Sequence, residues 1–150
     1  MKLPTFKDAI NFAIKREEES IQGYGSMIDL AKTPGIKNLL QELQEEKRND
    51  KQLLQDLTEG KIKSYEPGEV VDLKISDYIE EEPLDADMDF QGLLIFAAKK
   101  EQKAVELYSD LAKKSKAEEP RKLFEFLAEQ EKSHKLKLEI EYDKYILAED

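Results

Sequence analysis

Residues 90–111 read FQGLLIFAAKKEQKAVELYSDL, and the order of residue types in this stretch decides the fold. Alternating steps of four and three residues place seven of its side chains on one face of a helix. These seven are Phe90, Leu94, Ala97, Glu101, Ala104, Tyr108 and Leu111. The face suits a hydrophobic core except for the glutamate at its centre. Because a buried carboxylate is costly unless a cation, a proton or a hydrogen-bond donor meets it, Glu101 indicates a polar site inside a helical bundle.

Residues 6–27 repeat this pattern, with the same types of residue in the same order. The seven positions there are Phe6, Ile10, Ala13, Glu17, Ser20, Tyr24 and Met27. The two halves of the chain align at an offset of 84 residues, without gaps from Phe12 to Leu54 of the first half. In this alignment Glu17 matches Glu101. The repeat predicts two similar helical hairpins, each of which points a glutamate into a shared core.

Two further stretches have the same spacing and carry a polar pair at the centre. The first pair is Lys47 and Asp50, and the second is Glu131 and His134. Residues three apart lie on one helix face and can reach one ligand. Glu-x-x-His is the spacing found in carboxylate-bridged di-iron bundles, so the sequence predicts a metal site in the core. The repeat offset places Lys47 on Glu131 and Asp50 on His134.

Capping residues and prolines set the expected helix boundaries, which are about 5–31, 34–59, 88–116 and 119–146. The expected caps are Thr5 with Asp8, Thr33 before Pro34, Gly60, and Asp87 or Asp89. We predict an all-α fold with a single domain over residues 1–150. Its architecture is an antiparallel four-helix bundle of ferritin-like topology, with a long crossover, about 61–87, between the second and third helices. The crossover is expected to lie ordered along the bundle, with a short helix near 76–81, and the alternative is a mobile acidic linker.

The composition excludes several classes of function. The chain has 34 acidic and 24 basic residues, a formal charge of −10, and phosphate binding needs a basic face, so no nucleic-acid partner is expected. The absence of cysteine excludes disulfides, thiolate zinc sites and a rubredoxin-type iron centre within this chain. No apolar run reaches membrane-spanning length, and the N-terminal residues lack the apolar core of a signal peptide. We expect a cytoplasmic protein that does not bind membranes.

The second half of the chain resembles the rubrerythrin branch of the ferritin-like family. The resemblance rests on AAKKEQKAVELYSDLA at 97–112 and LFEFLAEQEKSH at 123–134. In that family a glutamate is followed seven residues later by a tyrosine, and a later helix carries Leu-Ala-x-x-Glu-x-x-His. The match covers both hairpins, but only the second is complete. It implies a four-helix bundle with a carboxylate-bridged di-iron site, chemistry on peroxide or oxygen, and often a dimer.

The resemblance also assigns roles to residues of this chain. The implied metal ligands are Glu17, Glu101, Glu131 and His134, together with Asp50 at a position where the family has histidine. Aspartate remains a suitable ligand for a hard metal. Tyr24 and Tyr108 each lie two turns from the glutamate of the same helix, where they either support it by a hydrogen bond or simply pack in the core.

Lys47 departs most from the family pattern, because it stands at the position of a bridging glutamate. A charged lysine donates protons and binds no metal. A register shifted by one residue would offer Glu46 and Asn49 in place of Lys47 and Asp50, but both would then leave the apolar face. A further interpretation is that the Lys47 ammonium group replaces a lost cation in a metal-free network of ion pairs.

Charge and ligand counting favour one bound metal ion, or none, over two. Four carboxylates contribute −4 and Lys47 returns +1, so the cluster carries −3 with neutral His134. One divalent ion leaves −1 and two leave +1, so charge alone does not choose between them. Two irons, however, would share five ligands and face an ammonium group.

We therefore predict a rubrerythrin-like metal-binding protein with a remodelled site. The expected metal is iron, with another divalent ion as an alternative. If it is active, the protein would reduce peroxide or oxidise ferrous iron, with electrons from a separate donor, and the resemblance favours a homodimer. The alternative function is a non-enzymatic bundle that has lost its metals and acts as a binding or assembly module.

Overall fold

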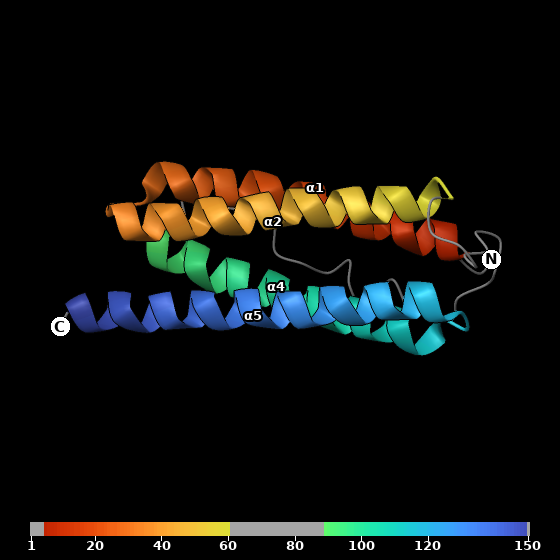
Figure 1. The fold of residues 1–150 in the computed structure, drawn as a ribbon. Helices are drawn as coiled ribbons and strands as arrows, with labels where there is room; N and C mark the ends of the chain where they lie inside the picture. Colours follow the sequence, from red (N-terminus) through yellow and green to blue (C-terminus); the bar gives the residue numbers. More distant parts are fainter. Residues whose placement is uncertain (1–4, 61–88, 150) are drawn as a thin grey trace, which may run out of the picture.

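Four long helices form the part of the chain that the structure, a computed structural model, describes: residues 5–60 and 89–149, with side chains through residue 144. The helices are α1 (Phe6–Leu30), α2 (Pro34–Thr58), α4 (Phe90–Lys114) and α5 (Glu118–Glu149). Helices α1 and α2 form one antiparallel hairpin, and α4 and α5 form a second that packs against it (Figure 1). The predicted all-α four-helix bundle is confirmed.

The helix ends lie close to the predicted positions because the expected caps are made. Thr5 and Asp8 form a capping box, in which each backbone N–H donates to the other residue's side chain at 2.9 and 3.2 Å. Thr33 and Asp89 accept hydrogen bonds from the backbone N–H three residues further on, at 3.3 and 2.8 Å. Gly60 follows α2 with a φ of +77°, which glycine adopts without steric cost.

The end of the first hairpin and the start of the second lie at opposite ends of the bundle. In Figure 1 α2 ends near the start of α1, whereas α4 begins at the opposite end. This arrangement agrees with a long connection between α2 and α4. The crossover expected at 61–87, with its short helix near 76–81, lies outside the described residues. Among the described helices, none is long and apolar enough to cross a membrane.

The core consists of two hydrophobic clusters, one toward each end of the bundle. The first cluster includes Phe6, Ala13, Leu54, Tyr108, Phe124 and Leu127. The second cluster includes Tyr24, Leu43, Phe90, Ala97 and Leu138. Residues related by the 84-residue offset fall in opposite clusters, as Phe6 and Phe90 do. The two hairpins are therefore related by an approximate twofold axis that passes between the clusters.

Neighbouring residues of α5 provide a test of this core. Leu127 is fully buried, whereas the adjacent Phe126 is 52% exposed. Leu127→Ala should lower the free energy of unfolding by about 2–5 kcal/mol, because it removes buried methyl groups and leaves a cavity. Phe126→Ala should change it by no more than about 0.5 kcal/mol. Urea denaturation followed by circular dichroism measures both, and equal losses would contradict the assigned face of α5.

Candidate metal site

A layer of charged side chains fills the bundle core between the two hydrophobic clusters. Its members are Glu17 from α1, Lys47 and Asp50 from α2, Glu101 from α4, and Glu131 and His134 from α5. Each is 2% exposed or less. The structure thus brings the five predicted ligands together in the core, with Lys47 among them.

The register of α2 follows the predicted core face. Lys47 and Asp50 are buried, whereas Asn49 is exposed. The alternative register, with Glu46 and Asn49 in the core, is therefore wrong. Nevertheless Glu46, whose side chain is 30% exposed, reaches the site from its edge.

The ammonium group of Lys47 lies among three carboxylates from three other helices. Its Nζ donates to Glu131 Oε2 and lies 3.0 Å from Glu101 Oε1 and 3.7 Å from Glu17 Oε2. Burial lowers the pKa of this amine, but the three carboxylates outweigh burial and raise the pKa well above its usual value. Lys47 is therefore a fixed positive charge at the centre of the bundle.

Two tyrosines bind the two central glutamates across the bundle. The hydroxyl of Tyr24 donates to Glu101 Oε1 at 2.9 Å, and that of Tyr108 donates to Glu17 Oε1 at 2.7 Å. Each tyrosine thus bonds the glutamate of the other hairpin, not the one in its own helix as the sequence suggested. Seven residues of helix span about 10.5 Å along the axis, so the facing helix offers the nearer partner.

One nitrogen of His134 is held by a carboxylate, and the other faces the centre of the site. Nε2 pairs with Glu46 Oε2. Nδ1 lies 3.4 Å from Glu101 Oε2 and 3.6 Å from Glu131 Oε2. Since a carboxylate accepts hydrogen bonds, we assign the Nε2 proton to the Glu46 contact. This tautomer leaves the lone pair of Nδ1 directed at two carboxylates, an arrangement suited to a shared cation.

The contact of Glu46 has a counterpart in the other half of the chain. Gln130 faces Asp50 and, with its amide nitrogen turned toward that carboxyl as the partners require, donates to both oxygens at 2.6 and 2.5 Å. The repeat offset relates Glu46 to Gln130 and Asp50 to His134. Sequence reasoning assigned no role to Gln130 and considered Glu46 only in the wrong register. The repeat itself was the signal that could have paired these two contacts.

Four buried polar atoms lack a hydrogen bond within the described part of the chain. They are Glu17 Oε2, Glu101 Oε2, Glu131 Oε1 and His134 Nδ1. Three of the four belong to Glu101, Glu131 and His134, each of which offers a ligand atom within 4.8 Å of the others. Buried polar atoms in native proteins are normally satisfied, so a group of three residues that each retain an unsatisfied atom suits a single metal ion.

A second metal ion fits the site poorly. The other possible group is Glu17, Asp50 and Glu131, but Gln130 occupies both oxygens of Asp50. Lys47 lies against two members of each group, at Glu101 and Glu131 in the first and at Glu17 and Glu131 in the second. The hold of Gln130 on Asp50 is therefore what separates the two groups. An ammonium cannot ligate a metal and repels one. The donor set therefore suits one metal ion and not the pair that the family resemblance implies.

The carboxyl groups of the layer differ in their protonation. Burial raises the pKa of Glu17 to about 7 and also raises the pKa values of Asp50 and, more strongly, Glu131. For Glu101, burial is outweighed by the charge of Lys47 and by neighbouring Glu131 and His134, and its pKa is lowered. The pKa of His134 is raised, because the influence of Glu101 and Glu46 exceeds that of burial. Lys47 alone therefore does not offset all four carboxylates, and further positive charge is accommodated by protons or by a metal.

Comparison with known proteins agrees with the four-helix bundle fold. A family profile described as rubrerythrin matches residues 8–142. Among solved structures, a hypothetical protein from Pyrococcus furiosus is similar, with 25% sequence identity, a TM-score of 0.72 and coverage of 95% of each chain. A search of curated proteins finds no significant match.

Removal of the Lys47 charge tests how far this ammonium group stabilises the metal-free protein. Lys47→Met should lower the free energy of unfolding by about 3–5 kcal/mol, because it leaves buried carboxylates without their cation. The matched control is Lys51→Met, one turn further along α2, whose ion pair with Glu18 is partly exposed. That change should cost about 0–1 kcal/mol. Denaturant unfolding in the presence of a chelator measures both, and equal effects would show that Lys47 carries no special charge compensation.

Proposed function

Because this chain belongs to the rubrerythrin family, we propose that it binds one divalent transition-metal ion, preferably iron, and uses it in redox chemistry. The proposed ligands are Glu101, Glu131 and His134. The observation that carries the proposal is that these three buried residues bring ligand atoms within 4.8 Å of one another and that each also has a buried atom without a hydrogen bond. Imidazole and carboxylate donors together suit first-row transition metals such as iron and zinc.

Residues outside the ligand set support its geometry. Glu46 accepts from Nε2 of His134 and so presents Nδ1 to the site. Tyr24 donates to Oε1 of Glu101, while Oε2 faces Nδ1 of His134 at 3.4 Å. These contacts hold two of the three proposed ligands before any metal binds, which reduces the ordering needed on binding.

Lys47 supports the limit of one metal ion. It contacts one oxygen of Glu101 and one of Glu131, and the other oxygen of each makes no hydrogen bond within the described residues. Each of these two carboxylates can therefore lie between the ammonium group and a metal ion. In this proposal the ammonium takes the place of the second cation.

The proposed activity is reduction of peroxide or oxidation of ferrous iron. A bound iron ion would supply one-electron redox chemistry near Glu101 and Tyr24. Since the chain has no cysteine, electrons for peroxide reduction would come from a separate protein or small donor. We also propose a homodimer, for which two exposed apolar side chains one turn apart on α5 offer surface: Leu136 and Ile140.

Substitution of the histidine tests metal binding. His134→Ala should abolish binding of ferrous or cobaltous ion or weaken it at least about tenfold, since it removes a metal ligand. Alanine is a good helix former, so α5 should remain intact. Asp50→Asn is the matched control and should leave one metal ion per chain. Isothermal titration of chelator-treated protein measures both, and an unchanged affinity in the histidine variant would exclude His134 as a ligand.

A double substitution tests whether Lys47 limits the number of metal ions. Lys47→Glu with Asp50→His gives α2 the Glu-x-x-His pair already present in α5. The layer would then hold four glutamates and two histidines, a charge of −4 that two divalent ions neutralise. Bound metal should rise from about one to about two per chain, as measured by elemental analysis after iron loading. No increase would show that the two halves of the site are not equivalent.

The alternative function is a metal-free bundle that acts as a binding or assembly module. Its support is the same Lys47, which makes its three ion pairs without any metal. Metal analysis of protein purified without chelator, followed by titration with ferrous ion, distinguishes the two functions. A chain that binds no metal under these conditions would favour the alternative.

A further inference from the structure

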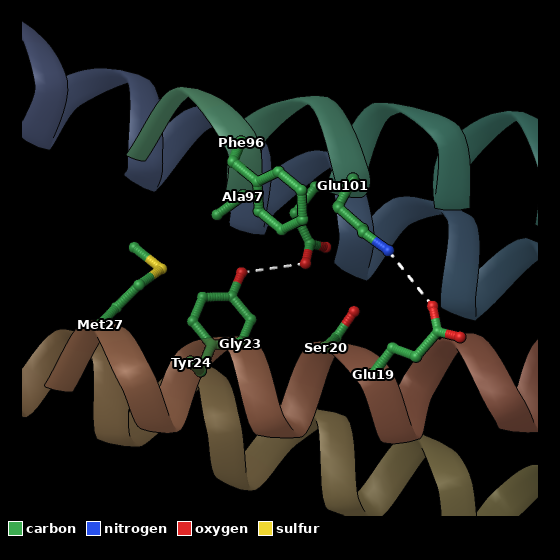
Figure 2. A pocket seen from close by; sticks show the side chains of 9 residues that line it. Glu19, Ser20, Gly23, Tyr24, Met27, Phe96, Ala97 and Glu101 are labelled. Atoms are coloured by element: carbon green, nitrogen blue, oxygen red, sulfur yellow. Dashed lines mark hydrogen bonds and ion pairs between the residues drawn. The ribbon is translucent and has the colours of Figure 1, made fainter. Parts of the chain in front are cut away.

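A groove between α1 and α4 leads from the surface to the charged layer. Its lining includes Gly23, Tyr24, Met27, Phe96, Ala97 and Glu101, and its volume is about 20 Å³. Figure 2 shows these side chains from close by, with the Tyr24–Glu101 hydrogen bond at the inner end. At the outer edge the ammonium of Lys100 pairs with Glu19 at 3.3 Å. A space of this size accommodates about one water-sized molecule.

The inner end of the groove meets a proposed metal ligand. Glu101 Oε1 accepts from Tyr24, and Oε2 of the same carboxylate lies 3.4 Å from Nδ1 of His134. A molecule in the groove therefore meets Glu101, which is itself one of the three proposed ligands. Gly23 leaves open space in the lining, because a Cβ added there would meet nothing within 4 Å.

Comparison of residues related by the approximate twofold axis indicates why the groove is open on one side of the site. The 84-residue offset relates Gly23 to Leu107 and Ser20 to Ala104. Leu107 is 1% exposed and packs in the first hydrophobic cluster. In the half of the site near Glu17, a leucine side chain thus occupies the position that is empty beside Tyr24. The groove opens on the half that contains His134.

We propose that this groove is the port through which a small neutral molecule, of the size and polarity of water or hydrogen peroxide, reaches the site. Its walls near the inner end are apolar, formed by Met27, Phe96 and Ala97, which favours a neutral molecule over a hydrated ion. The Tyr24 hydroxyl and the Glu101 carboxylate offer hydrogen-bonding groups where the apolar wall ends. The delivery of a ligand to a metal rests on the proposed function, whereas the port itself does not.

Thiol labelling tests the port without any metal. The chain has no cysteine, so Ala97→Cys introduces a single thiol that lines the groove. Ala13→Cys is its control at the position related by the repeat, where Ala13 is fully buried. Hydrogen peroxide, a neutral oxidant of the size proposed for the port, should convert the thiol at position 97 to sulfenic acid and water roughly tenfold faster than that at 13. Trapping of the sulfenic acid with dimedone labels the oxidised protein and measures the rate. Equal rates in the folded proteins would overturn the port.

A plug at Gly23 completes the test. Gly23→Leu, added to Ala97→Cys, should slow labelling roughly tenfold, with Gly23→Ala intermediate and available if the larger change disturbs folding. Gly35→Leu is the control, because Gly35 is exposed at the start of α2 and its added Cβ meets nothing within 4 Å. It should leave the labelling rate unchanged. An unchanged rate with either plug at position 23 would overturn the port.

The same plug separates access from metal binding. In otherwise unmodified protein loaded with ferrous ion, Gly23→Leu should keep the metal content and slow binding of nitric oxide, a small neutral probe with its own electron paramagnetic resonance signal. An unslowed rate would overturn delivery through this groove. If the parent chain takes up no iron, the proposed function fails, and the labelling rates at position 97 still decide whether the port exists.

Discussion

The structure depends on how four buried carboxylates are compensated in the middle of an apolar core. Lys47 supplies one positive charge, placed against Glu17, Glu101 and Glu131. Tyr24 and Tyr108 add hydrogen bonds to two glutamates from opposite directions. One fixed cation does not neutralise four carboxylates, so the layer retains protons or admits one further cation. The two hydrophobic clusters on either side tolerate the layer because nearly all of its charges have partners.

The approximate twofold axis explains most contacts of the layer, and its violations mark where the site is specialised. The tyrosine–glutamate bonds obey it, as do the pairs made by Glu46 and Gln130. It is broken where Lys47 faces Glu131. The result is an asymmetric layer, in which the ammonium contacts glutamates of both halves, whereas the single histidine lies beside Glu101 and Glu131 only.

The approximate twofold relation is broken a second time, at the groove that leads toward the site. Gly23 opens the groove beside Tyr24, whereas the related Leu107 is buried in packed core. The groove, the histidine and the unsatisfied oxygen of Glu101 all fall in the same half of the site. The proposed port therefore reaches the proposed metal position from the half of the site in which His134 and Glu101 have atoms without hydrogen bonds. On the other side, Tyr108 and the first hydrophobic cluster surround Glu17.

The sequence by itself determined the four helices, their caps and which polar residues point inward, because helical periodicity and local capping depend only on neighbours along the chain. Glu17, Asp50, Glu101, Glu131 and His134 could therefore be placed in one layer. Only the tertiary structure decided which atoms meet. The crossed tyrosine bonds, the contacts of Glu46 and Gln130, and the three partners of Lys47 depend on how far facing helices slide along each other. That offset arises from side-chain packing between helices, which no pattern within one helix specifies.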